Sequence, residues 1–253
     1  MLSPLPERSS VLFGRRLIEF LVALSILGLG CALEEKSRPS IPKHTKEEIP
    51  MLENITWLGH ASFKITGEKV VYIDPWKLKE GAEHADIILI THDHYDHLVP
   101  EDVMKIQKES TTIVTTADGA KKLSGNIKTV KAGDTLTVEG IQIEAVPAYN
   151  IGKEFHPKAS GWVGYIVTIG GQRIYHPGDT DLIPEMENVQ ADIAFLPVGG
   201  TYTMNAEEAA QAANKIKPKV AVPMHYGTIV GSIEDAKKFQ EKCQVPVDIL
   251  TAE

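Results

Sequence analysis

Residues 91–98 read T-H-D-H-Y-D-H-L and directly follow the apolar run 87–90, I-I-L-I. Three histidines and two aspartates therefore gather behind a segment that predicts a buried strand. Side chains two positions apart in extended backbone point the same way, so we expect His92 and His94 to face one point. Imidazole and carboxylate groups together suit zinc, manganese or iron. The stretch predicts half of a metal site, against the alternative of an exposed histidine-rich loop.

Further ligand-type side chains are needed to complete such a site. Asp96 and His97 fall on the turn after the first pair, and two pairs along one loop can serve two metals ~3.5–4 Å apart. Downstream, I-Y-H-P-G-D-T places Asp179 just past a predicted strand, and V-P-M-H-Y-G does the same for His225. Residues at the ends of core strands meet at one edge of a sheet, where a rigid site can be built.

The composition limits the classes of function. The chain has 253 residues, which is enough for one domain with a full core. Its formal net charge of -8 argues against a protein that binds nucleic acid by neutralising many phosphates. The two cysteines, Cys31 and Cys243, allow no disulfide framework.

The N-terminal region differs in kind from the rest. Arg15 and Arg16 precede a short apolar stretch, residues 17–30, and Cys31 follows it. A basic start, a short apolar segment and small residues before a cleavage point are typical of a secretory signal. The sequence L-G-L-G-C resembles a bacterial lipobox, although Gly28 stands where such motifs usually carry leucine.

Three segments follow from this reading. We expect residues 1–31 to form a signal or lipoprotein-like segment that exports the protein and anchors it on the outer side of the cytoplasmic membrane. The alternatives are an uncleaved membrane anchor and a buried N-terminal helix. Residues 32–50 are charged and contain proline, which indicates a linker. Residues 51–253 then form one folded domain.

Apolar runs separated by turn residues predict a strand-rich domain. The pairs 139–140 (E-G) and 170–171 (G-G) are typical of hairpin turns. Helical patterns are fewer, and many strands followed by few helices predict two packed sheets with helices outside. The predicted strand regions are Ile55–Thr66, Val70–Ile73, Asp86–Ile90, Thr112–Thr115, Leu136–Val146, Trp162–Tyr175, Ala194–Val198, Val220–Pro223 and Val247–Leu250.

Two segments have strong helix signals. Residues 205–216 begin with Asn205 as an N-cap, and residues 232–242 begin with Ser232 in a sequence typical of a capping box. Residues 101–108 show a weaker helical pattern.

The motifs T-H-D-H-Y-D-H, H-P-G-D-T and P-M-H-Y, in this order, resemble those of metallo-β-lactamase-fold hydrolases. The opening W-L-G-H-A-S-F, Trp57–Phe63, and the following D-P at Asp74 and Pro75 are similar to the branch that includes L-ascorbate-6-phosphate lactonase-like proteins. The resemblance covers about residues 51–251. It implies an α/β fold, a four-layer αββα sandwich, with metals at one edge between the sheets.

The same resemblance implies one or two divalent metal ions per chain, with zinc favoured and manganese, iron or nickel as alternatives. Water between two metals would be a hydroxide at neutral pH and would act as the nucleophile. Asp96 would also orient that hydroxide and handle its proton, which makes it the implied catalytic residue. The implied ligands are His92 and His94 for the first metal, Asp96, His97 and His225 for the second, and Asp179 as the bridge.

One position departs from the family pattern. The superfamily usually supplies a third histidine to the first metal, but the strand end expected to carry it holds Tyr149 and Asn150. Three alternatives stay open: His156 reaches back from its loop, Asn150 coordinates through its amide oxygen, or the first site is incomplete. We carry His156 forward as the ligand because Gly152 and Pro157 let its loop turn sharply.

The predicted function is hydrolysis of an ester-like bond, such as a lactone or phosphodiester, in a small anionic molecule. A non-catalytic metal-binding protein of the same fold and a nuclease are the alternatives. Asp96, Asp179 and His225 together exceed what a structural metal needs, which favours the enzyme. We assign His60 to substrate binding, with a histidine that supports a metal ligand and a core histidine as its alternatives, and expect Trp162 in the core. The expected partners are a small substrate and a membrane, without nucleic acid.

The N-terminal reading has a direct test. If Cys31 is lipidated, the mature chain should carry added acyl mass and partition with membranes, and Cys31→Ser should block this processing. One acyl chain anchors only marginally, so a diacyl modification is expected. Mass spectrometry of the purified chain checks this, and a soluble cytoplasmic protein with Met1 intact would contradict it.

Overall fold

The structure is a computed structural model, and it describes residues 50–253. The predicted signal segment, Cys31 and all but the last residue of the predicted linker lie outside the described residues. Among the helices of the described part, none combines the length and apolar character needed to cross a membrane.

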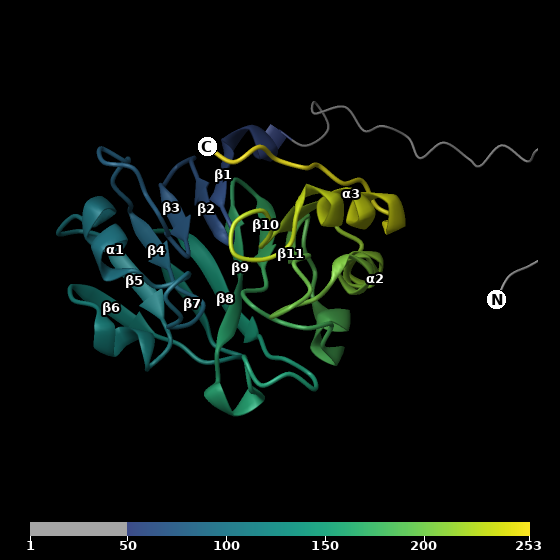
Figure 1. The fold of residues 1–253 in the computed structure, drawn as a ribbon. Coiled ribbons are helices and arrows are strands. Elements are labelled where there is room, and N and C mark those ends of the chain that lie inside the picture. Colours follow the sequence, from purple (N-terminus) through teal and green to yellow (C-terminus); the bar gives the residue numbers. More distant parts are fainter. Residues whose placement is uncertain (1–49) are drawn as a thin grey trace, which may run out of the picture. The chain divides into compact units, whose positions relative to one another are not determined.

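Two six-stranded sheets pack face to face, with α1 on the outer side of the first sheet and α2 and α3 on the outer side of the second (Figure 1). The predicted four-layer αββα sandwich is therefore confirmed. The first sheet contains, in spatial order, β1 (Ile55–Gly59), β2 (Ser62–Ile65), β3 (Val71–Ile73), β4 (Ile87–Leu89), β5 (Thr112–Thr115) and β6 (Asn126–Thr129).

The second sheet and the helices complete the sandwich. The second sheet contains, in spatial order, β12 (Val220–Met224), β11 (Ile193–Pro197), β10 (Gln172–His176), β9 (Val163–Ile169), β8 (Ile141–Pro147) and β7 (Thr135–Val138). The helices are α1 (Pro100–Ile106), α2 (Ala206–Ile216) and α3 (Ile233–Lys242), with short 3₁₀ turns at Pro50–Asn54, Gly119–Lys122, Lys158–Ser160 and Pro184–Asn188.

In each sheet, parallel strands bring their carboxyl ends to the edge where the site lies. β3, β4, β5 and β6 are parallel neighbours in the first sheet, and β10, β11 and β12 are parallel neighbours in the second. Asp74 follows β3 and Thr91 and His92 follow β4, while Asp179 follows β10 and His225 follows β12. The topology therefore gathers residues from distant parts of the sequence.

Turn chemistry explains the hairpins. The predicted turns occur where expected: Glu139 and Gly140 join β7 to β8, and Gly170 and Gly171 join β9 to β10, all four with positive φ. A left-handed turn of this kind matches the twist of the paired strands.

The predicted single strand Ile55–Thr66 is wrong, because the chain reverses within it. β1 and β2 pair antiparallel across a tight turn in which Gly59 has φ 105° and His60 has φ 53°. The turn has no exposed polar residue at its tip, since His60 and Ala61 are themselves fully buried, and this hides it in the sequence.

Two further differences have simple causes. The predicted strand Val247–Leu250 is limited to a single bridge between Val247 and Ala221. β6 was not predicted because N-I-K-T lacks apolar alternation, and its residues are mostly exposed at the edge of the sheet.

The helices begin where their caps predict. At α2 the Asn205 side chain accepts from the backbone of Glu208, and the Glu208 carboxylate accepts from the backbone of Asn205. At α3 the Asp235 carboxylate accepts from the backbone of Ser232, and the backbone of Asp235 donates to the Ser232 carbonyl. Two otherwise unpaired donors at each helix start are thereby satisfied.

The main core lies between the sheets. The rings of Phe63 on β2 and Phe195 on β11 stack with centroids 4.0 Å apart and nearly parallel planes, and both side chains are fully buried. A smaller apolar cluster, which includes Ile88, Val103 and Ile106, fills the space under α1. The stacked pair joins the two sheets beneath the site.

Phe195→Ala should lower the free energy of unfolding by ~3–5 kcal/mol, because it removes a fully buried ring and leaves a cavity between the sheets. Denaturant unfolding followed by circular dichroism measures this change. Met104→Ala, which truncates a side chain 63% exposed on α1, is the control and should change stability by less than ~0.5 kcal/mol. Equal stability of the two variants would contradict the assigned core.

Candidate metal centre

Three histidines form the first group of candidate ligands. One ring nitrogen from each of His92, His94 and His156 lies within 4.8 Å of the other two. The ring centroids of His92 and His94 are 4.6 Å apart, and His156 lies 5.1 Å and 5.0 Å from them. The loop between β8 and β9 thus carries His156 to the predicted first pair, at the place where the family's third histidine was expected.

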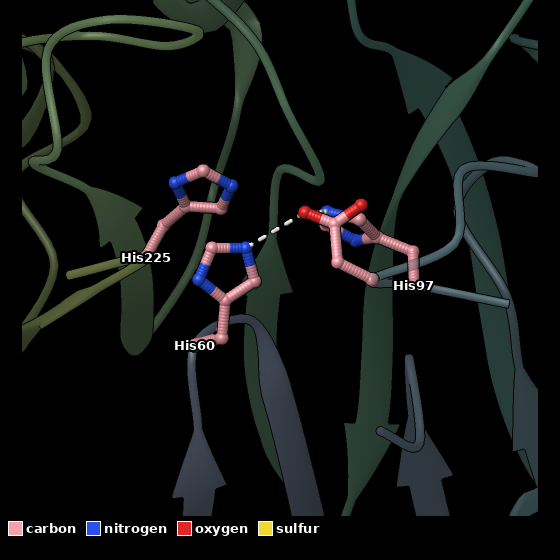
Figure 2. Close-up of side chains that lie close together, drawn as sticks. His60, His97 and His225 are labelled. Carbon is pink, nitrogen blue, oxygen red and sulfur yellow. Dashed lines mark hydrogen bonds and ion pairs between the residues drawn. The ribbon is translucent and has the colours of Figure 1, made fainter. Parts of the chain in front are cut away.

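A second group combines histidines from three segments. Ligand-type atoms of His60, Asp96, His97 and His225 all lie within 4.8 Å of one another. Figure 2 shows His60 beside His225 and facing the carboxylate with which it bonds, and His60 Nε2 lies 3.0 Å from Asp96 Oδ2. The rings of His60 and His225 are 3.8 Å apart. The predicted second set is therefore assembled, with His60 added.

Asp179 lies between the two groups. Its Oδ1 is 3.3 Å from His97 Nε2, and its Oδ2 is 3.0 Å from His225 Nε2 and 3.3 Å from His156 Nε2. One carboxylate therefore faces histidines of both groups. This is the position that a bridging ligand requires.

Several buried atoms of this cluster have no hydrogen-bond partner within residues 50–253, and a buried polar group without a partner is costly. Divalent cations would satisfy all of them except one nitrogen of the His225 ring, since these atoms are lone-pair donors or can become so by losing a proton. These atoms are Nε2 of His92, His97 and His156, both ring nitrogens of His225, and Oδ1 of Asp179.

The spacing also fits a metal. Nitrogen ligands around tetrahedral zinc lie roughly 3.4 Å apart, because each Zn–N bond is about 2.0–2.1 Å. Groups that span no more than 4.8 Å reach this geometry through small side-chain rotations. The residues present therefore fit one or two divalent ions.

Asp74 fixes the orientation of two predicted ligands. Its Oδ2 accepts from His97 Nδ1 at 2.8 Å and from the Thr91 hydroxyl at 2.7 Å, and its Oδ1 accepts from the Thr91 backbone at 2.8 Å. Because the Thr91 hydroxyl donates to Asp74, it accepts from His92 Nδ1, 2.9 Å away. Both histidines are thus held as tautomers whose Nε2 faces the metal position.

Asn150 does the same for His156. Its Oδ1 accepts from the backbone of His156 at 3.0 Å and from its Nδ1 at 3.1 Å, while its Nδ2 donates to the carbonyl of Tyr202. The amide oxygen is therefore directed at His156, and the alternative in which Asn150 itself ligates a metal is not supported. Sequence reasoning missed this role.

Burial and charge divide the histidines into two kinds. Burial lowers the pKa of His156 to about 4 and, with the charge of His97, holds the pKa of His92 well below its usual value. Burial also opposes charge on His97, but Asp179 and Asp74 overcome it and raise its pKa well above the usual value. Burial would raise the pKa of Asp179, yet His225 and His97 hold it well below its usual range. The neutral rings of His92 and His156 and the ionised Asp179 suit metal binding, whereas His97 must lose a proton when a metal binds.

Two assignments need correction. His60 was assigned to substrate binding, but its ring is fully buried and its Nε2 bonds to Asp96, so its position favours the alternative of a histidine that supports a metal ligand. Trp162 was expected in the core, but it is half-buried and packs against His92 and His94, with ring centroids 5.0 and 4.6 Å apart. It forms a wall behind the first group, and its Nε1 donates to Asp118.

The sequence pattern of the beta-lactamase superfamily domain matches residues 54–225. A UPF0173 metal-dependent hydrolase of Thermoplasma acidophilum is 35% identical over 201 residues, which are 74% of this chain and 88% of that relative. Another of the same description, from Methanopyrus kandleri, is 36% identical over 211 residues, 75% of this chain and 91% of the relative.

Among solved structures, a metallo hydrolase from the hyperthermophilic archaeon Ignicoccus hospitalis is 26% identical and superimposes with a TM-score of 0.63. That likeness covers 78% of this chain and 94% of the archaeal chain.

Fold, site and relatives together define the class as metal-dependent hydrolases with the metallo-β-lactamase fold, which confirms the predicted superfamily and the prediction of an enzyme. Within that class, the chain belongs to the UPF0173 family of metal-dependent hydrolases.

Replacing a candidate ligand should lower the metal content. His156→Ala should lose roughly one equivalent of metal per chain, and Asp179→Ala should lose more because it faces both groups. Elemental analysis of protein purified without added metal measures the change. His84→Ala, which truncates an exposed histidine, is the control. Full metal content in Asp179→Ala would exclude it as the bridge.

Proposed function

We propose that this protein hydrolyses an ester-like bond, such as a lactone or phosphodiester, in a small molecule. One observation carries the proposal: Asp179 joins two groups of candidate ligands beside an open pocket of about 340 Å³, which Asp96 and Asp179 help to line. A structural metal has no need of a pocket at its ligands, whereas a catalytic one keeps a position open to substrate.

The proposed ligands are those carried over from the family motifs, with one or two divalent ions, zinc favoured. The first ion would be held by His92, His94 and His156, and the second by Asp96, His97 and His225, with Asp179 between. When bound, such ions polarise the substrate and supply an acidified water as nucleophile at neutral pH.

Asp96 is the proposed catalytic residue because it combines a fixed position with access to the pocket. Its Oδ2 is held by a hydrogen bond with His60, and Asp96 is one of the residues that line the pocket. Burial would raise the pKa of Asp96, but the His60 hydrogen bond and the charge of His97 lower it below its usual value. The carboxylate is therefore ionised and can orient water and take up its proton.

Two finer parts of the proposal rest on the sequence. The opening strand Trp57–Phe63 and the D-P pair support a relation to the L-ascorbate-6-phosphate lactonase-like branch. The basic and apolar N-terminal segment with Cys31 supports export and attachment to the outer side of the cytoplasmic membrane. The proposed partners are accordingly a small-molecule substrate and a membrane.

Chelation should abolish hydrolysis of p-nitrophenyl esters, lactones and bis(p-nitrophenyl) phosphate, and added zinc or manganese should restore it. In metal-loaded Asp96→Asn, kcat should fall about 10²–10⁴-fold, because the amide cannot take up the proton. Metal content is measured in parallel to separate proton handling from ligation. Activity that survives complete chelation, or no activity on any of these substrates, would contradict the proposal.

A further inference from the structure

The pocket beside the metal centre has a distinct chemical lining. On one side it contains the centre's own residues, and on the other it is bounded by aromatic and aliphatic side chains from four separate loops. The lining residues are His94, Asp96, His156 and Asp179 on the first side and Tyr95, Phe155, Tyr202 and Ile229 on the second.

The apolar side of this pocket is exposed to solvent. Tyr95 is 70% exposed and Phe155 47% exposed, and Ile151 on the same loop as Phe155 is 55% exposed. Phe155 meets Tyr202 edge to face, with ring centroids 4.7 Å apart. Large apolar groups gathered at one exposed spot mark a binding surface more often than chance. Here that surface opens onto the candidate ligands.

The loop that carries Phe155 is held in place without a ligand. Asn150 ties its two ends together and also bonds to the carbonyl of Tyr202. Lys153 donates to Asp181 and to the carbonyl of Thr203, each at 2.6 Å. Phe155 and Tyr202 therefore stand as a formed wall, which lowers the cost of ordering them around a substrate.

Within residues 50–253, the surroundings of the pocket offer no unpaired lysine or arginine to an anionic substrate. None of its eight lining residues is lysine or arginine. The lysines on the neighbouring segments are paired: Lys153 with Asp181, and Lys158 with Glu185. Lys122, beside the histidine motif, is paired with Asp93.

The carboxylates of the metal centre also disfavour an anionic substrate. Asp74, Asp96 and Asp179 all face the candidate ligands and offset most of the charge that two divalent ions would bring. An anionic group in the pocket would therefore meet little compensating positive charge beyond the ions themselves. Sites that select phosphate usually add arginine or lysine.

We propose that the pocket binds the uncharged, apolar acyl group of a carboxylic ester or lactone, held against Phe155, Tyr202 and Ile229. This inference rests on the proposed function and narrows it, since it selects a neutral carboxylic ester over a phosphodiester or other anionic substrate. The neutral substrate proposed here differs from the anionic substrate that the sequence predicts.

The reaction is a simple addition of water. The oxygen of water bonds to the acyl carbon, and the bond from that carbon to the alkoxy oxygen breaks. The alkoxy oxygen leaves with its electron pair and takes a proton from the attacking water, which Asp96 is placed to transfer. An ester gives a carboxylic acid and an alcohol, a lactone gives a single hydroxy acid, and no oxidant or reductant is needed.

The test uses the metal-loaded full chain and four chromogenic substrates that release the same p-nitrophenol. They are p-nitrophenyl acetate, butanoate and hexanoate, with bis(p-nitrophenyl) phosphate as the anionic counterpart. Burial of four added methylenes should make kcat/KM for the hexanoate on the order of ten- to a hundredfold higher than for the acetate. Every ester should exceed the phosphodiester.

Variants show which residues cause the preference for a longer acyl chain. Phe155→Ala and Tyr202→Ala should each lower kcat/KM for the hexanoate by about tenfold through KM, and that for the acetate by less than about threefold. Tyr202→Ala keeps the backbone carbonyl to which Asn150 donates, so the loop stays tied. Phe155→Lys should shift the preference toward bis(p-nitrophenyl) phosphate. Met104→Ala, an exposed apolar residue on α1, is the matched control.

Binding gives a readout that does not depend on turnover. Saturation-transfer NMR should detect hexanamide on the protein more strongly than hexyl phosphate, and Phe155→Ala should weaken that signal. Metal content measured in each variant shows whether His156, next to Phe155, is still in place.

The outcomes separate the two proposals. The acyl-pocket proposal is overturned if the protein prefers bis(p-nitrophenyl) phosphate. It is also overturned if kcat/KM is equal across the ester series and unchanged in Phe155→Ala. Neither result contradicts the proposed hydrolase function. Absence of hydrolysis of all four substrates and of lactones by metal-loaded protein overturns the proposed function. Stronger binding of hexyl phosphate than of hexanamide overturns the pocket independently.

Discussion

The metal centre depends on one buried carboxylate. Asp74 is fully buried and has φ 46°. Both of its carboxylate oxygens accept hydrogen bonds, from Thr91 and from His97. Through Thr91 it also sets the tautomer of His92. The parallel register of β3 and β4, with Ile73 opposite Leu89, brings this carboxylate beside the histidine motif. A carboxylate that accepts from the far nitrogen of a ligating histidine both orients the ring and strengthens it as a ligand.

The centre also joins the two sheets. The His225 backbone, after β12 of the second sheet, donates to the carbonyl of His60 in the β1–β2 turn of the first, at 2.8 Å. Both residues have positive φ, 58° and 53°, a conformation that costs free energy for residues other than glycine. Such strain persists only where surrounding packing imposes it, and here the stacked Phe63 and Phe195 beneath the site hold the sheets together. The fold thus maintains two strained histidines at the point where the candidate ligands meet.

Sequence reasoning predicted the sandwich and its strand-end residues because apolar periodicity and ligand spacing are local signals. It did not predict the role of Asp74, since the partners of that carboxylate follow the next strand, nor that of Asn150, which acts through His156. It assigned His60 to substrate binding because the sequence around His60 does not show that the chain turns after Gly59. That turn directs the His60 ring into the protein. Contacts between distant segments decide these roles, and one sequence without a fold does not contain them. The signal available was a polar residue directly after an apolar strand, as at Asp74.

Metal affinity of Asp74→Asn tests the central claim most directly. The amide keeps the size of the carboxylate but replaces one acceptor of Thr91 and His97 by a donor, so His97 and His92 lose the partner that fixes their tautomers. Competition of the protein with a chromogenic chelator for zinc measures the affinity, and circular dichroism verifies the fold. We expect affinity to fall roughly 10–100-fold with the fold retained. Affinity equal to that of the unmodified protein in a folded Asp74→Asn variant would contradict the claim that this carboxylate organises the centre.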